Sequence, residues 1–170
     1  MKSLFNHFGK EDEVLSIDSS IRRTLFLDYG TIIFENKQWL LKLHIYSTTG
    51  QDFYIITRPI TLRAIDGIIF VADSENSTYY RNLTSWNELC NYFEEDFKKI
   101  PKILAFNKQD LKYKFNTSEF LENINSFKYT NLKTKKTVAL TGEGVVESFE
   151  ELLELILKKI YKSQMVSLVE

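Results

Sequence analysis

The sequence is poor in residues that interrupt or crosslink a chain, with six glycines, two prolines and one cysteine among 170 residues. The single cysteine, Cys90, excludes a disulfide within the chain, and we expect a packed core thiol in a reducing compartment. Two histidines, His7 and His44, are too few to suggest a histidine metal site. We expect His44 within a strand and His7 in an irregular N-terminal segment. Nothing in the sequence suggests a Ser-His-Asp or Cys-His catalytic device.

The sequence also lacks an excess of positive or negative charge. Lysine and arginine number 22 against 23 acidic residues, so the charge gives no reason to expect nucleic acid or an anionic membrane as a partner. No apolar run reaches the ~18 residues of a membrane span, and the N-terminus has no signal-peptide stretch. These absences predict a cytoplasmic protein. The 44% hydrophobic content suits one domain, which we expect over 16–164, with tails over 1–15 and 165–170.

What the sequence does contain is an alternation of apolar runs and helix-like stretches. Apolar runs predict strands over 23–36, 37–48, 66–74, 101–106 and 135–142, and helical spacing predicts helices over 79–100, 117–127 and 145–162. We expect Thr117 or Ser118 to cap the second helix, and a Glu154–Lys158 pair on the third. The order predicts a three-layer α/β domain with a mostly parallel sheet and helices on both faces.

Ligands of such sheets bind at the carboxyl ends of the strands, where this chain has three unusual segments. In "ILAFNKQD", a buried strand ends at Asn107, Lys108, Gln109 and Asp110. A guanine edge offers two adjacent donors, and one carboxylate, that of Asp110, can accept both. The stem of Lys108 can lie along the base, while Asn107 can link neighbouring loops. This pattern suggests guanine recognition, although for so short a motif taken alone a polar strand-to-helix turn is the commoner explanation.

Glycines mark the other two strand ends. In "VALTGEGV", Gly142 and Gly144 permit a turn that aims backbone N–H groups outward, where they could contact the guanine carbonyl oxygen. In "YSTTGQDFY", the N–H of Gly50 can approach a terminal phosphate and Gln51 can orient an attacking water. Each segment alone also fits an ordinary loop.

Together, and in this order, the segments "RTLFLDYG", "LHIYSTTGQDFY", "IDGIIFVADS", "NKQD" and "TGEGV" resemble the Ras-like small GTPases. The resemblance runs from about residue 16 to 161 and is closest to the MglA-type group of gliding-motility and polarity GTPases. It implies a P-loop-NTPase-like fold that binds GTP or GDP with magnesium.

The resemblance also implies roles for individual residues. Asn107, Lys108 and Asp110 would read guanine, with backbone N–H groups at Ala139 assisting. Thr24 would approach magnesium and the terminal phosphate, and Gln51 would position the attacking water. Arg23 would match a built-in arginine finger that acts when a roadblock-type dimer reshapes the switch, or it is a plain surface charge beside Arg22.

One part of the family pattern is missing from these residues, the phosphate loop Gly-x-x-x-x-Gly-Lys-Ser/Thr. Only Gly9 is followed by lysine, but Leu4 stands five residues before it and Glu11 follows Lys10. Compared with the family, the first strand, this loop and most of the first helix are absent. Without the loop we expect weak nucleotide affinity and no hydrolysis, because backbone N–H groups and the lysine around the phosphates supply most of the affinity.

Several interpretations remain open. In the first interpretation, the chain is a pseudo-GTPase that acts through protein–protein interaction, with a roadblock-type dimer as partner at the switch surface over 54–63. Alternatively, it is a truncated or split form of an active GTP-hydrolysing switch. The place of the absent strand could be closed by its neighbours, filled by 3–8 or 165–169, or supplied by another chain. A receiver-like signalling domain, with Asp28 and Asp73 at strand ends, explains the sequence less well because it gives "NKQD" no role.

Overall fold

The structure, a computed structural model, describes residues 1–9, 15–17, 27–48, 62 and 65–167. The chain divides into two compact units, Met1–Arg63 and Ala64–Glu170. None of the helices in the described part of the chain is both long enough and apolar enough to cross a membrane.

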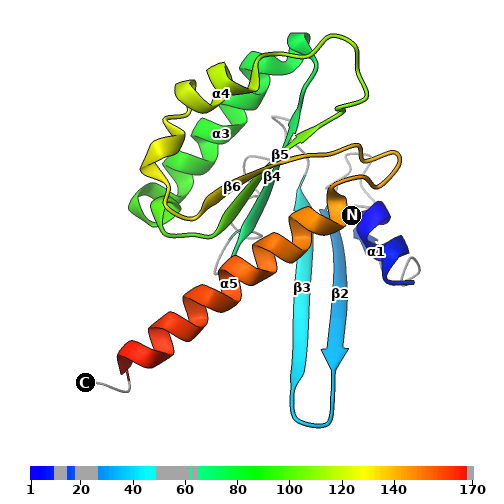
Figure 1. The fold of residues 1–170 in the computed structure, drawn as a ribbon, viewed down its shortest axis with the longest axis vertical. Coiled ribbons are helices and arrows are strands. Elements are labelled where there is room, and N and C mark those ends of the chain that lie inside the picture. Colours follow the sequence, from blue (N-terminus) through cyan, green and yellow to red (C-terminus); the bar gives the residue numbers. More distant parts are fainter. Residues whose placement is uncertain (10–14, 18–26, 49–61, 63–64, 168–170) are drawn as a thin grey trace. The chain divides into compact units, whose positions relative to one another are not determined.

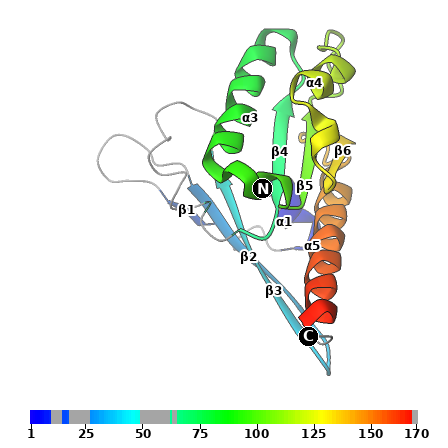
Figure 2. The same cartoon turned by 90° about the vertical axis from the view of Figure 1, so that its left-hand side faces the viewer.

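The first unit is built on an antiparallel hairpin. Its elements are α1 (Lys2–His7), β1 (Leu15–Ile17), β2 (Leu27–Glu35) and β3 (Leu40–Thr48), and the strand order is β1-β2-β3 (Figures 1 and 2). Asn36 makes the turn between β2 and β3: its backbone N–H donates to the carbonyl of Trp39 at 3.0 Å, and its side-chain oxygen accepts from Gln38 and Trp39. The two consecutive strands expected over 23–36 and 37–48 are therefore confirmed in the described residues.

The N-terminal segment differs from the prediction, because His7 ends a helix rather than lying in an irregular stretch. The helix has an apolar face whose Leu4 and Phe5 are buried. The ring of Phe5 packs against Gly30 of β2, in the space that a side chain at position 30 would fill. Phe8, just after the helix, meets Phe34 edge to face at 5.6 Å between ring centroids. These aromatic contacts explain why so short a helix is ordered.

The second unit has the predicted three-layer α/β architecture. Its sheet consists of the parallel strands β4 (Ile68–Asp73), β5 (Lys102–Asn107) and β6 (Leu132–Lys136), in that order. Helices α3 (Tyr79–Phe93) and α4 (Thr117–Asn123) cover one face, and α5 (Val145–Ser167) covers the other (Figures 1 and 2). Single-turn 3-10 helices lie at Asn76–Thr78 and Ser126–Lys128, and a longer one at Glu94–Lys98.

The core of this unit lies between the sheet and α3 and α4. Most of its buried side chains are aromatic or aliphatic: Ala72, Trp86, Phe97, Leu104, Phe106, Phe115, Phe120 and Ile124. Cys90 is only partly buried at the margin of this cluster, with its thiol 3.4 Å from the hydroxyl of Tyr129. The predicted core thiol therefore packs against the core rather than inside it.

The structure corrects the prediction at several element ends and at one helix cap. The last strand, β6, ends at Lys136, and residues after it turn instead of continuing to 142. The helix after β4 ends at Phe93, followed by the 3-10 segment. Asn116, rather than Thr117 or Ser118, caps α4, because its side-chain oxygen accepts from the backbone N–H groups of Ser118 and Glu119. The Glu154–Lys158 pair on α5 is confirmed, at 2.6 Å.

Candidate functional site

The carboxyl ends of β4 and β5 lie side by side in the second unit. The two strands are parallel, and their last paired residues are Asp73 and Asn107. The loop that follows each strand therefore starts at the same edge of the sheet. Residue 106 of β5 pairs with residue 136 at the end of β6, which brings the glycine-containing loop to the same edge. The sequence-predicted strand ends at Asn107 and at the glycine-containing loop thus converge, whereas the one at Gly50 lies outside the described residues.

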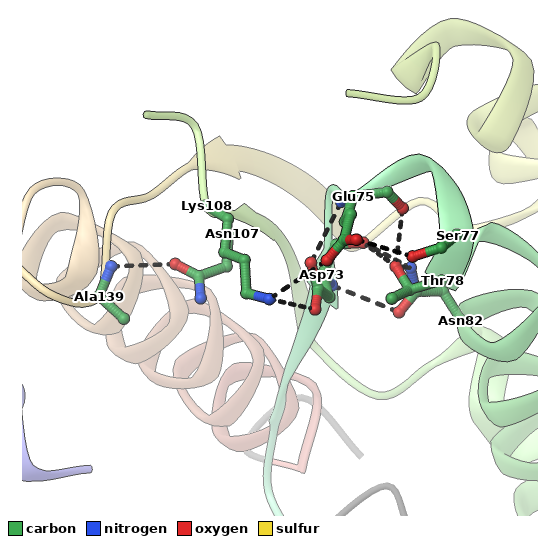
Figure 3. A network of polar contacts seen from close by, with 8 residues as sticks. All are labelled: Asp73, Glu75, Ser77, Thr78, Asn82, Asn107, Lys108 and Ala139. Carbon is green, nitrogen blue, oxygen red and sulfur yellow. Dashed lines mark hydrogen bonds and ion pairs between the residues drawn. The ribbon is translucent and has the colours of Figure 1, made fainter. Parts of the chain in front are cut away.

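Asn107 links the loop after β5 to the loop after β6. Its side-chain oxygen accepts a hydrogen bond from the backbone N–H of Ala139 at 2.9 Å (Figure 3). The same oxygen accepts from the hydroxyl of Thr137 at 3.1 Å. Asn107 therefore ties neighbouring loops together, as the sequence suggested. Because the N–H of Ala139 donates to Asn107 here, its contact with a guanine carbonyl remains a prediction.

Lys108 begins the turn in an unusual backbone conformation and forms an ion pair. Its φ of 62° lies in the left-handed region. Its ammonium lies 2.7 Å from a carboxylate oxygen of Asp73 and 3.8 Å from one of Glu75 (Figure 3). The hydrogen bond from Lys108 to Asp73, together with the charges of Asp73 and Glu75, raises the pKa of the lysine. The lysine is thus held toward the end of β4.

Gln109 fixes the middle of this turn from three sides. Its backbone N–H donates to the carbonyl of Thr137 at 3.1 Å, and its side-chain amide donates to the hydroxyl of Ser74 at 2.8 Å. The ammonium of Lys114 donates to the carbonyl of Gln109 at 2.6 Å. The turn is therefore braced against the ends of β4 and β6 before any ligand binds.

Asp110 is the exposed member of the turn. Its carboxylate has no hydrogen-bond or ion-pair partner among the residues that the structure describes. Both of its oxygens are therefore available to accept, while the turn that carries it is pinned by its neighbours. A free carboxylate on a fixed turn is suited to a planar group that offers two adjacent N–H donors.

The loop after β6 is shaped by two glycines with left-handed backbones, Gly142 (φ 85°) and Gly144 (φ 71°). A side chain at position 144 would collide with the carbonyl oxygen of Lys136. The N–H of Gly142 donates to the carbonyl of Val138 at 2.9 Å, and the N–H of Val138 donates to the carbonyl of Glu143 at 3.0 Å. The glycines are therefore needed to fold this loop back beside Asn107.

The remaining predicted site residues, Arg23, Thr24, Gly50 and Gln51, lie outside the described residues, as does most of the predicted switch surface over 54–63. Thr24 was the residue expected to approach magnesium. Within the described ranges, no three acidic, histidine or cysteine side chains gather as metal ligands. Recognition of a guanine base by Asn107, Lys108 and Asp110, and an approach of Thr24 to magnesium, both remain predictions.

Sequence reasoning missed the residues that support the turn. Asp73 was considered only as a possible phosphoacceptor, and Glu75, Ser74 and Thr137 were not singled out. The pairing of residues between the two parallel strands β4 and β5 could have indicated the contact of Asp73 with Lys108. Parallel strands of similar length that end in "AD" and "FN" place Asp73 next to Asn107, so a lysine one residue later lies within reach of the carboxylate.

Comparisons with known proteins agree on one family. The model of the Ras family matches residues 15–158. The chain is 30% identical to the mutual gliding-motility protein MglA of Myxococcus xanthus over 168 residues, which is 95% of this chain and 85% of that protein. It is 31% identical to Rab-4A of Danio rerio and 29% identical to Rab-4 of Dictyostelium discoideum, each over 143 residues. It spans 65% and 68% of the lengths of those two Rab proteins.

Proposed function

The chain belongs to the Ras family of small GTPases, and from that premise we propose that it recognises the guanine base of GTP or GDP through Asn107, Lys108 and Asp110. We further propose that the polypeptide of these 170 residues is a pseudo-GTPase, whose output is the binding of a partner protein.

The proposal of guanine recognition rests on a contrast in hydrogen bonding between the carboxylate of Asp110 and the turn around it. The turn is pinned by Asn107 and by Gln109, whereas the carboxylate of Asp110 has no partner within the described ranges. Guanine presents a ring N–H beside an exocyclic amine, which matches the two oxygens of one carboxylate. Adenine presents an acceptor where guanine has the ring N–H, so a carboxylate selects against it. The fixed turn also reduces the ordering cost of binding.

The pseudo-GTPase part of the proposal rests on the absent phosphate loop. No glycine among the six is followed by the Lys-Ser/Thr pair that holds phosphate and magnesium. The base would then provide most of the affinity, and the triphosphate little. Gln51 and Arg23 would have no positioned phosphate on which to act, so we expect no hydrolysis by this polypeptide alone.

Calorimetry with the 170-residue protein tests both parts. We expect guanosine, GDP and GTP to bind with similar dissociation constants, about 100 μM or weaker, with no dependence on magnesium. Adenosine is the matched control and should not bind. Magnesium-dependent binding of GTP at micromolar or tighter affinity would instead support the active-switch interpretation, in which Thr24 approaches the metal and Gln51 positions water. Equal binding of guanosine and adenosine would contradict guanine recognition.

A specific observation on the first unit supports the protein-binding output. The β2–β3 hairpin exposes apolar side chains, with Trp39 52% and Leu40 60% exposed and Ile33 and Tyr46 also well exposed. The rings of Tyr29 and Tyr46 lie 5.0 Å apart across the strands, and the hydroxyl of Tyr29 lies 2.6 Å from His44 Nδ1. Clustered exposed aromatics are typical of protein interfaces.

We propose a roadblock-type regulatory dimer as the partner of this hairpin and of the switch surface. Gel filtration with light scattering, on the protein mixed with a purified roadblock-type dimer from the same genome, should show a complex. Trp39→Ala and Tyr46→Ala should weaken that complex. The exposed Lys37→Ala, in the same hairpin turn, is the matched control and should not. A mixture that elutes as its separate components would contradict this partner.

A further inference from the structure

We propose that Asp73, with Glu75 in support, is a positioning residue for guanine recognition that acts by holding the side chain of Lys108 in place. This inference rests on the proposed function, because it assigns a role in the same base site. It concerns two acidic residues at the end of β4.

The contact between Asp73 and Lys108 joins the carboxyl ends of β4 and β5. The nearer oxygen of Asp73 lies 2.7 Å from the ammonium of Lys108, whereas the nearer oxygen of Glu75 lies 3.8 Å from it. The Asp73 side chain is 24% exposed and the Lys108 side chain 44% exposed, so the pair is partly sheltered from solvent. Asp73 therefore makes the hydrogen-bonded contact and Glu75 adds a longer-range attraction.

Asp73 is itself fixed, so it can fix another side chain. Its second carboxylate oxygen accepts from the backbone N–H of Glu75 at 3.1 Å. Its carbonyl accepts from the hydroxyl of Thr78 at 2.7 Å and from the amide of Asn82 at 2.8 Å. Asn82 belongs to α3 and is buried, so the carboxylate is anchored to the core of the second unit (Figure 3).

The consequence concerns the aliphatic stem of Lys108. With its backbone in the left-handed region and its ammonium bound to Asp73, both ends of this long side chain are restrained. A free lysine side chain loses rotamer entropy when it packs on a ligand. Here the ion pair already restrains those rotamers, so the stem is arranged to cover one face of a base whose edge hydrogen-bonds to Asp110. The same ion pair occupies the ammonium, so Lys108 contributes through its stem rather than as a phosphate ligand.

A double-mutant cycle tests this role. Asp73→Asn keeps the oxygen that accepts from Glu75 but removes the charge, and Lys108→Met keeps a similar stem but removes the ammonium. We expect Asp73→Asn to weaken guanosine binding, followed by NMR titration, by about three- to fivefold at low salt. In the Lys108→Met background the same change should have no effect, and in about 1 M salt the loss should shrink. Glu75→Gln, at the longer distance, is the matched control and should cause a smaller loss.

A second measurement does not depend on binding. The NMR titration of the Lys108 ammonium should give a pKa that falls when Asp73 becomes Asn, and that changes less in Glu75→Gln. An unchanged Lys108 signal in Asp73→Asn would overturn the ion pair. Equal losses of affinity in the wild-type and Lys108→Met backgrounds would overturn action through Lys108. If the wild-type protein binds no guanosine at all, the proposed function fails and the role of Asp73 fails with it. If the wild type binds and Asp73→Asn binds equally well, only this inference fails.

Discussion

The side-chain oxygen of Asn107 accepts a hydrogen bond from the backbone N–H of Ala139 at 2.9 Å, joining two loops that lie 32 residues apart in the sequence. The hydroxyl of Thr137 donates to the same oxygen at 3.1 Å. One short side chain thus connects the turn that carries Lys108 and Asp110 to the glycine-containing loop. The relative placement of these two loops therefore depends on Asn107.

Replacement of Asn107 should therefore affect both stability and binding. Asn107→Ala removes an acceptor of two hydrogen bonds, and we expect the free energy of unfolding to fall by about 1–2 kcal/mol in urea denaturation. Guanosine binding should be lost at the same time, because the two loops are no longer joined. Thr137→Val removes only one of the two bonds and is the control, with a smaller loss of stability. Unchanged guanosine affinity in Asn107→Ala would contradict the link.

Asp110→Asn should change which base is bound. The amide of Asn offers a donor where the carboxylate offers an acceptor, and xanthine carries a carbonyl oxygen in place of the amine of guanine. We expect guanosine binding to weaken by about 30-fold or more, since a hydrogen bond to a charged group is lost. Xanthosine binding should improve in the variant. Competition between guanosine and xanthosine measures the switch, and an equal loss for both nucleosides would count against edge recognition by this residue.

The burial of Lys102 should make the free energy of unfolding depend on pH. Its side chain is fully buried, with its ammonium donating to the carbonyl of Ile100 and lying 4.7 Å from the centroid of the Phe97 ring. Burial lowers its pKa from 10.5 to about 8. In that interval the unfolded chain binds a proton that the folded chain does not, so the free energy of unfolding should rise as pH increases from about 8 to about 10.5.

Lys102→Met isolates this effect. Below pH 8 the wild-type protein folds with a buried cation, so the variant should be more stable by about 1–3 kcal/mol at pH 7. Its advantage should decrease through the interval from about 8 to about 10.5, as the wild-type lysine becomes neutral. Denaturation at several pH values measures both curves. Lys162→Met, at an exposed position on α5, is the control and should follow the wild type. A constant difference between Lys102→Met and wild type across the interval would contradict the lowered pKa.

Gly144→Ala should destabilise the loop that faces Asn107. The backbone at 144 has a φ of 71°, and the added methyl group would collide with the carbonyl oxygen of Lys136. We expect a loss of about 2–3 kcal/mol, which combines left-handed strain with the collision. Gly9→Ala is the matched control, because Gly9 has a φ of 65° with open space around it, and its loss should be near 1 kcal/mol. Equal losses in thermal unfolding would show that the collision does not matter.

The strands β4 and β5 and the polar turns at their carboxyl ends could be predicted from the sequence because both depend on local pattern. The runs at Ile68–Asp73 and Lys102–Asn107 are short, apolar and bounded by polar turns, and both form strands of the parallel sheet. The approach of Asn107 to the loop at Ala139 also followed, since parallel strands bring their carboxyl ends together.

Other features could not be predicted, because they depend on tertiary contacts that a local sequence pattern does not contain. Val138 and Leu140 read as strand residues, but Leu140 is 92% exposed in a turn, because the glycines after it reverse the chain. The helix α4 starts at Thr117 because the N–H of Phe115 bonds the carbonyl of Ser74, which fixes where the chain can turn and leaves Asn116 as the cap. Burial of Lys102 was not foreseeable, since lysine is rarely inside without a partner.

The most direct test of guanine recognition is a titration of the isotope-labelled protein with guanosine and, separately, with adenosine, followed by amide NMR. The account predicts that guanosine shifts the signals of Lys108, Gln109, Asp110 and Ala139 in a saturable manner, and that adenosine leaves them in place. Saturable shifts of the same signals by both nucleosides, or no shift by guanosine, would contradict it.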